Sequence, residues 1–150
     1  MLKPYTKIFL KNTFHSFDNI CEILNIKKKT LGIYISFFHT LIITKMYYEL
    51  YYTDPYTNKL FIHWYYFLHS VILSNIILNG CILVKLERHL LEDKKYLGPH
   101  NIIIYPFLSL FSIKDYNTIK TIQTRFAMLT FIYALYVSHL KYIDYISNGS

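Results

Sequence analysis

The chain has 150 residues, enough for one small folded unit, and 53% of them are hydrophobic, a high share for a soluble domain. Its net charge of +7 gathers beside apolar segments instead of on one polar face, which argues against a nucleic-acid-binding protein. The two cysteines, Cys21 and Cys81, provide no disulfide framework and no CxxC site.

Residues 5–26 predict an amphipathic helix. Apolar side chains recur along it at steps of three and four residues: Leu10, Phe14, Phe17, Cys21 and Leu24. Charged side chains occupy its other faces. A helix of this kind either lies in a membrane interface or packs on a folded domain, and we expect the interface.

Two longer apolar segments, 30–51 and 60–84, come next. The second has no charged residue between Lys59 and Lys85. As a helix it would measure roughly 35 Å, more than the ~30 Å of a hydrocarbon core. We predict a transmembrane helix over each segment, and the short loop between them makes the two helices antiparallel neighbours.

The rest of the chain completes an expected all-α membrane fold. Residues 101–113 are apolar but short and contain Pro106, so a re-entrant or interfacial segment is expected, with a fourth span as the alternative. Residues 121–143 predict the third transmembrane helix. The chain is thus read as a single membrane-embedded unit, with 85–120 as a loop on the cytosolic side.

The basic residues predict an orientation. Thirteen of the 16 Lys and Arg residues lie before the first predicted span or between the second span and the apolar run of the third, which begins at Phe126. Basic loops stay on the cytosolic side of a membrane. We therefore expect a cytosolic N-terminus and an outside C-terminus, in the plasma membrane in preference to the mitochondrial inner membrane or the endoplasmic reticulum.

Three features predict a surface that binds another protein. Small residues recur at every fourth position on the first and third spans, which lets helices approach closely in lipid. On the central span, Asn75 and Asn79 lie on one stripe with Trp64, and an amide facing lipid costs about 1 kcal/mol or more. The predicted partner-binding residues are Asn75, Asn79, Trp64, Gly32, Ser36, Thr40, Thr130, Ala134 and Ser138.

No sequence motif indicates catalysis, a metal or a cofactor. Four histidines lie in or near the predicted spans: His39, His63, His69 and His139. Paired histidines on facing helices can bind a haem, but the favoured reading is that each makes a hydrogen bond. We expect no enzyme activity, no bound metal and no cofactor.

Two short stretches resemble known families. Leu68-His69 with Leu78-Asn79-Gly80 resembles the start of the second membrane helix of cornichon-type cargo receptors. Residues 99–105, with Arg88-His89-Leu90, are similar to parts of the succinate dehydrogenase cytochrome anchor. The first resemblance implies a cargo receptor of the early secretory pathway, and the second a small respiratory subunit at a haem or quinone.

The function expected from these features is that of a non-catalytic accessory or regulatory subunit. It would bind a larger polytopic membrane protein, and stabilise or modulate it. An ion-transporting ATPase or another transporter is the expected partner, together with membrane lipids and without nucleic acid. The respiratory subunit and the cargo receptor are the alternatives.

Overall fold

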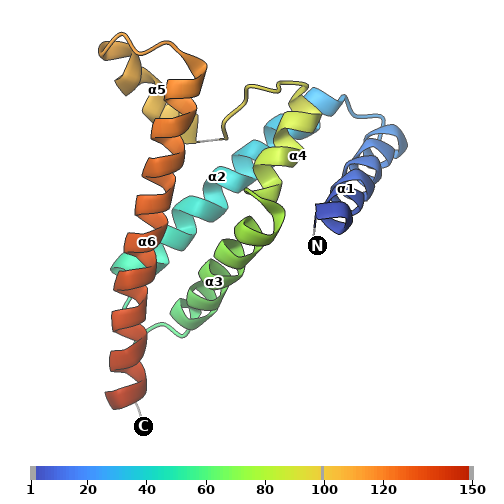
Figure 1. Ribbon diagram of the computed structural model, residues 1–150. Helices are drawn as coiled ribbons and strands as arrows, with labels where there is room; N and C mark the ends of the chain where they lie inside the picture. The colour runs from blue at the N-terminus through green and yellow to red at the C-terminus, as the bar shows by residue number, and fades with distance from the viewer. Residues whose placement is uncertain (1–2, 99, 149–150) are drawn as a thin grey trace. The chain divides into compact units, whose positions relative to one another are not determined.

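A computed structural model describes residues 3–98 and 100–148 of the chain. The predicted all-α fold is confirmed over these residues, which form helices and no strand. Pro99, the first residue of the anchor-like stretch, lies outside them. The helices in chain order are α1 (Lys3–Ile23), α2 (Lys28–Tyr52), α3 (Leu60–Leu78), α4 (Ile82–Leu91), α5 (His100–Leu110) and α6 (Tyr116–Asn148) (Figure 1).

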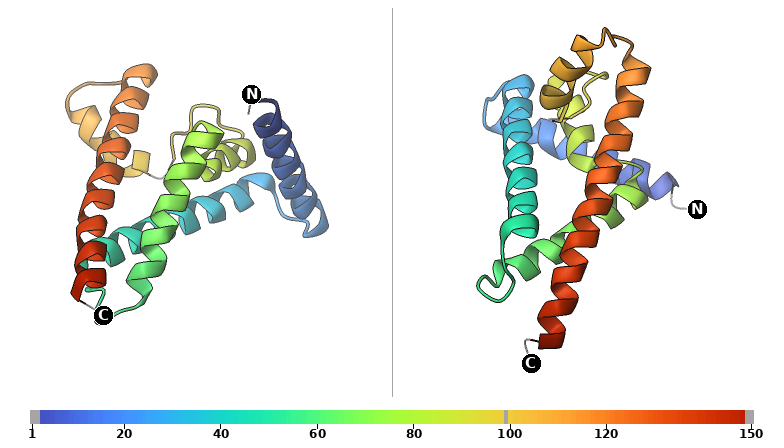
Figure 2. Two further views of the ribbon diagram at one scale, coloured as in Figure 1. Left: turned by 60° about the horizontal axis from the view of Figure 1, so that its bottom comes forward. Right: turned by 90° about the vertical axis from the view of Figure 1, so that its left-hand side faces the viewer.

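The single helix predicted over 60–84 is instead two helices, α3 and α4. Asn79 adopts a φ of 53° and Gly80 a φ of 116°, which are left-handed conformations that end a helix. The Gly80 N–H closes the turn by donating to the Asn75 carbonyl at 2.8 Å. In contrast, α6 runs unbroken over 33 residues (Figure 2).

Two of the helices, α3 and α6, are long and apolar enough to cross a membrane. The predicted span over 30–51 does form a helix, α2, but α2 is not among these two. The segment predicted to be re-entrant or interfacial is α5, a helix of 11 residues with Pro106 inside it. Three spans therefore remain a prediction, as does an interfacial position for α5.

The chain divides into two compact units, and each is described by itself. Unit 1 comprises residues 1–39 and 74–99, and unit 2 comprises residues 40–73 and 100–150, as far as they are described. Helices α2 and α3 contribute residues to both units.

The core of unit 1 joins α1, α2 and α4. Cys21, Leu86 and Leu90 are buried together, and four further side chains pack against them: Phe14, Phe17, Leu31 and Ile35. Much of the apolar stripe on α1 therefore packs on protein, which is the alternative to the expected membrane interface. Another set of apolar side chains on α1 is exposed: Tyr5, Ile8, Phe9, Ile20 and Ile23.

The core of unit 2 is formed by α2, α3 and α6. Its buried members are Met46, Leu50, Phe61, Tyr65, Leu68 and Ala134. The Lys141 ammonium on α6 donates to the carbonyls of Tyr51 and Thr53, at 2.8 and 3.0 Å, and so holds α6 to the end of α2. A hydrogen bond of 2.9 Å between Tyr65 and His139 adds a link from α3 to α6.

Candidate functional site

A thiol, an imidazole and a carboxylate lie in a row inside unit 1. Cys81 Sγ is 3.8 Å from His39 Nε2, and His39 Nδ1 is 2.7 Å from Glu87 Oε1. His39 is 5% exposed and Glu87 is fully buried, while Cys81 is half-buried. The three side chains come from α2, from the turn after α3 and from α4.

Each member of this row is positioned by local structure. The chain reversal at Asn79 and Gly80 places Cys81 at the N-cap of α4, where the free backbone N–H groups favour a negative charge. Glu87 follows on the same helix. His39 comes from α2, which approaches α4 closely because Gly32 has no side chain: a Cβ there would lie 3.0 Å from Leu91 and 3.1 Å from the Leu90 Cβ.

The hydrogen bonds define the roles open to the three groups. An ionised carboxylate only accepts, so His39 donates from Nδ1 to Glu87, which leaves Nε2 as the acceptor facing the Cys81 thiol. A thiol beside such an imidazole, at a helix N-terminus, is set up to lose its proton and act as a nucleophile. Because the two ring nitrogens face different partners, these side chains do not converge on a common metal position.

The second oxygen of Glu87, Oε2, is buried and has no hydrogen-bond partner among the described residues. Tyr96 lies close by and bonds through its hydroxyl to Ser36 at 2.6 Å. Burial raises the pKa of the Tyr96 hydroxyl, and the Glu87 carboxylate raises it further. Glu87 is therefore a fully buried carboxyl group that is hydrogen-bonded to His39.

No pattern in the sequence predicts this row of Cys81, His39 and Glu87. His39 and Glu87 are 48 residues apart, and no short motif links a histidine to a cysteine at the distances involved. Only the Asn79-Gly80 dipeptide, a common turn signal, could have indicated that Cys81 begins a new helix.

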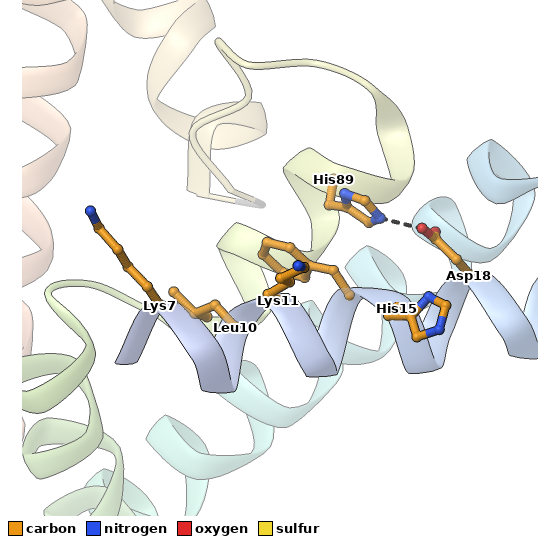
Figure 3. A pocket seen from close by; sticks show the side chains of 7 residues that line it. Lys7, Leu10, Lys11, His15, Asp18 and His89 are labelled. Carbon is orange, nitrogen blue, oxygen red and sulfur yellow. Dashed lines mark hydrogen bonds and ion pairs between the residues drawn. The ribbon is translucent and has the colours of Figure 1, made fainter. Parts of the chain in front are cut away.

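A shallow groove of about 420 Å³ runs along α1 to His89 on α4 (Figure 3). At its end Asp18 Oδ1 accepts hydrogen bonds from His89 Nε2 and Lys28 Nζ, both at 2.9 Å. Partial burial acts to raise the pKa of Asp18, but these two bonds outweigh it and leave the pKa below its usual value. The bond to Asp18 likewise raises the pKa of Lys28. These contacts hold α1 to α2 and α4.

The small residues predicted on the first span are used within the chain. Gly32 is buried against α4, and Ser36 bonds to Tyr96. Thr40 is half-buried in α2. For Gly32 and Ser36 the close approach that small residues permit therefore serves the chain itself.

The small residues predicted on the third span also face inward, in unit 2. Ala134 and Ser138 are fully buried, and Thr130 accepts a hydrogen bond of 3.3 Å from the Tyr47 hydroxyl. Trp64 is half-buried and packs against the same core. The predicted partner surface is thus largely occupied by intramolecular packing.

Asn75 and Asn79, which were predicted to lie on one stripe with Trp64, differ in their exposure. The amide oxygen of Asn75 is covered by the chain and lacks a hydrogen-bond partner in the part that the structure describes. Asn79 is exposed, but its positive φ makes it part of the turn after α3. A partner has no access to the Asn75 oxygen.

The remaining histidines of the predicted spans make hydrogen bonds of their own. His63 bonds to the Lys59 carbonyl at 3.3 Å and His69 to the Tyr65 carbonyl at 2.8 Å.

Comparison with protein-family models, curated proteins and solved structures finds no match to this chain. The case for function therefore rests on the residues themselves.

Proposed function

We propose that this chain is an integral membrane protein that acts as a non-catalytic accessory subunit of a larger membrane protein. Helices α3 and α6 cross the bilayer in this proposal. The partner is a polytopic protein, with a transporter or pump as the class expected from sequence analysis. The accessory role consists of stabilising or modulating that partner by helix packing.

The observation that carries the proposal is the exposure of α3 and α6. Only 17% of the apolar window in α3 and 11% of that in α6 are buried. The core helix of a soluble protein would be mostly buried, because exposed apolar area is unfavourable in water by about 25 cal/mol per Å². Lipid or another membrane helix covers such surface without that penalty.

One stripe on α6 supports a protein partner. Large exposed side chains recur at steps of three, four, three, four and three residues, which is the spacing at which two helices pack side by side. We call them the α6 seam: Phe126, Leu129, Tyr133, Tyr136, Leu140 and Ile143. The seam is about 26 Å long, close to the thickness of a hydrocarbon core. Its proposed occupant is a transmembrane helix of the partner.

Orientation is part of the proposal. A third span over 30–51 would place the termini on opposite sides, with the N-terminus cytosolic, as the basic residues favour. With α3 and α6 alone, both termini would be on one side. Protease protection of tags at the two ends in sealed vesicles distinguishes these arrangements. Protection of only one tag supports three spans. Protection of both tags, or cleavage of both, contradicts three spans.

Native purification in mild detergent, with mass spectrometry of co-eluting proteins, tests the accessory role. Leu129→Ala combined with Tyr136→Ala truncates the α6 seam. Met128→Ala combined with Thr124→Ala is the control, because both residues are exposed on α6 and lie on another face than the seam. We expect the seam variant to lose a co-eluting membrane protein that the wild type and the control retain.

Two results would contradict the proposal. Elution of the native protein alone, as a monomer, would show that it has no stable partner. Equal retention of the same partner by the seam variant and the control would show that the α6 seam is not the contact.

A further inference from the structure

We propose that Cys81 is a site of covalent acylation, which takes a fatty acyl group from an acyl thioester with His39 as the base and Glu87 as the residue that positions it. The attachment is a single event for each chain and involves no turnover. It would add a lipid anchor at the end of α3.

The geometry separates Cys81 from an ordinary thiol. Its sulfur is 3.8 Å from His39 Nε2, on a half-buried residue at the start of α4. The fixed bond of 2.7 Å to Glu87 orients the imidazole and stabilises it when it takes up the thiol proton. Cys21, in contrast, is 4% exposed and lies among apolar side chains in the core of unit 1.

The transfer balances without an oxidant or a metal. The Cys81 thiol gives its proton to His39 Nε2, and the thiolate attacks the carbonyl carbon of the acyl thioester. The new carbon–sulfur bond forms while the bond to the leaving sulfur breaks. The leaving thiolate then takes the proton from His39 Nε2, so that the products are an acylated Cys81 and a free thiol.

The position of Cys81 favours a long acyl chain as the group transferred. It lies three residues beyond the end of α3, and the exposed side chains of Ile76 and Ile77 precede it. Lys85 and Arg88 follow, as expected at the cytosolic edge of a membrane. Cysteines beside a membrane helix are common sites of fatty acylation. The choice of a long chain rests on the proposed membrane location, whereas the activated thiol does not.

The test uses the purified full-length chain in detergent, with palmitoyl-coenzyme A as the acyl thioester and intact mass as the readout. Cys21→Ala leaves Cys81 as the one cysteine, and Cys81→Ala leaves Cys21. We expect one acyl group on the first variant, removed by neutral hydroxylamine, and none on the second. Iodoacetamide provides a parallel measurement of thiol reactivity that needs no acyl chain.

Two further variants, in the Cys21→Ala background, test the roles of the neighbours. His39→Ala should slow acylation by about 100-fold, the usual scale of general-base catalysis, and added imidazole should restore part of the rate. Glu87→Gln keeps an oxygen that accepts from the imidazole but removes the charge, and should slow the reaction less. A merely structural role for His39 would show no rescue by imidazole.

Two outcomes would overturn the inference. Equal reaction of Cys21 and Cys81 with iodoacetamide would show that Cys81 is not activated. Fast alkylation of Cys81 without acyl transfer would reject the acyl thioester as the substrate class. Both results come from chains with unaltered His39 and Glu87, so misfolding of the neighbour variants cannot obscure them. Because the assay contains no partner, its failure is distinct from failure of the accessory role.

Discussion

Replacing Gly32 should disrupt unit 1, because α2 and α4 meet at this residue. A Cβ at this position would lie 3.0 Å from Leu91 side-chain carbons and 3.1 Å from the Leu90 Cβ, against about 3.5–4.0 Å for normal carbon contacts. Leu91 can move because it is half-buried, but Leu90 is fully buried. Overpacking costs about 1–3 kcal/mol, and the gain in helix propensity from Gly to Ala offsets about 1 kcal/mol of it.

Gly32→Ala should therefore destabilise unit 1 by about 0–2 kcal/mol, and Gly32→Leu by about 3 kcal/mol or more, since the larger side chain has no room. Cys21 reports on this, because it is buried beside Leu90. In a Cys81→Ala background, its rate of maleimide labelling should rise about tenfold for every 1.4 kcal/mol of lost local stability. Thr30→Leu, at an exposed site on α2, is the control. Unchanged labelling in Gly32→Leu would refute the close packing.

Three other predictions concern single side chains. Asn75→Leu should leave thermal stability equal or raise it, because the change removes a buried amide oxygen without a described hydrogen-bond partner. Asn79→Leu should lower thermal stability, because leucine is strained at the φ of 53° that this position adopts. A loss of stability from Asn75→Leu would contradict this reasoning. The pKa of Asp18 is lowered and that of Lys28 is raised, so their ion pair should stabilise unit 1 between about pH 4 and pH 10.4. This stabilisation should be lost as the pH falls through the folded pKa of Asp18 or rises through the folded pKa of Lys28. Thermal melts of the wild type and of Asp18→Asn should therefore converge at low pH. Asp115→Ala should lower the melting temperature more than Asp115→Asn, because the carboxylate accepts from the first turn of α6 at 2.8 Å, and equal melting temperatures would show that the cap is unimportant.

Sequence patterns predicted the helices well where apolar periodicity is long and unbroken. The segment 121–143 lies inside α6, and 30–51 lies inside α2. The prediction over 60–84 was wrong in its continuity, because hydropathy measures only how apolar a segment is. The left-handed turn at Asn79 and Gly80 depends on backbone conformation, which a window of apolar residues does not reveal.

Sequence patterns could not predict the candidate site, and the reason is a different one. The small residues Gly32 and Ala134 were recognised as contact points between helices, but their partners are the chain's own helices. Spacing along one helix indicates which residues share a face, and not what covers that face. The row of Cys81, His39 and Glu87 likewise depends on packing between α2 and α4, which brings together residues far apart in sequence.

Alkaline carbonate extraction of membranes from cells that express the full-length chain tests whether α3 and α6 cross a membrane. Carbonate releases soluble and peripheral proteins but leaves proteins with membrane-spanning helices in the pellet. Because α3 and α6 expose most of their apolar windows, we predict that the chain stays in the pellet and is released only by detergent. Recovery of a monodisperse protein in the carbonate supernatant would contradict the claim that these helices cross a membrane.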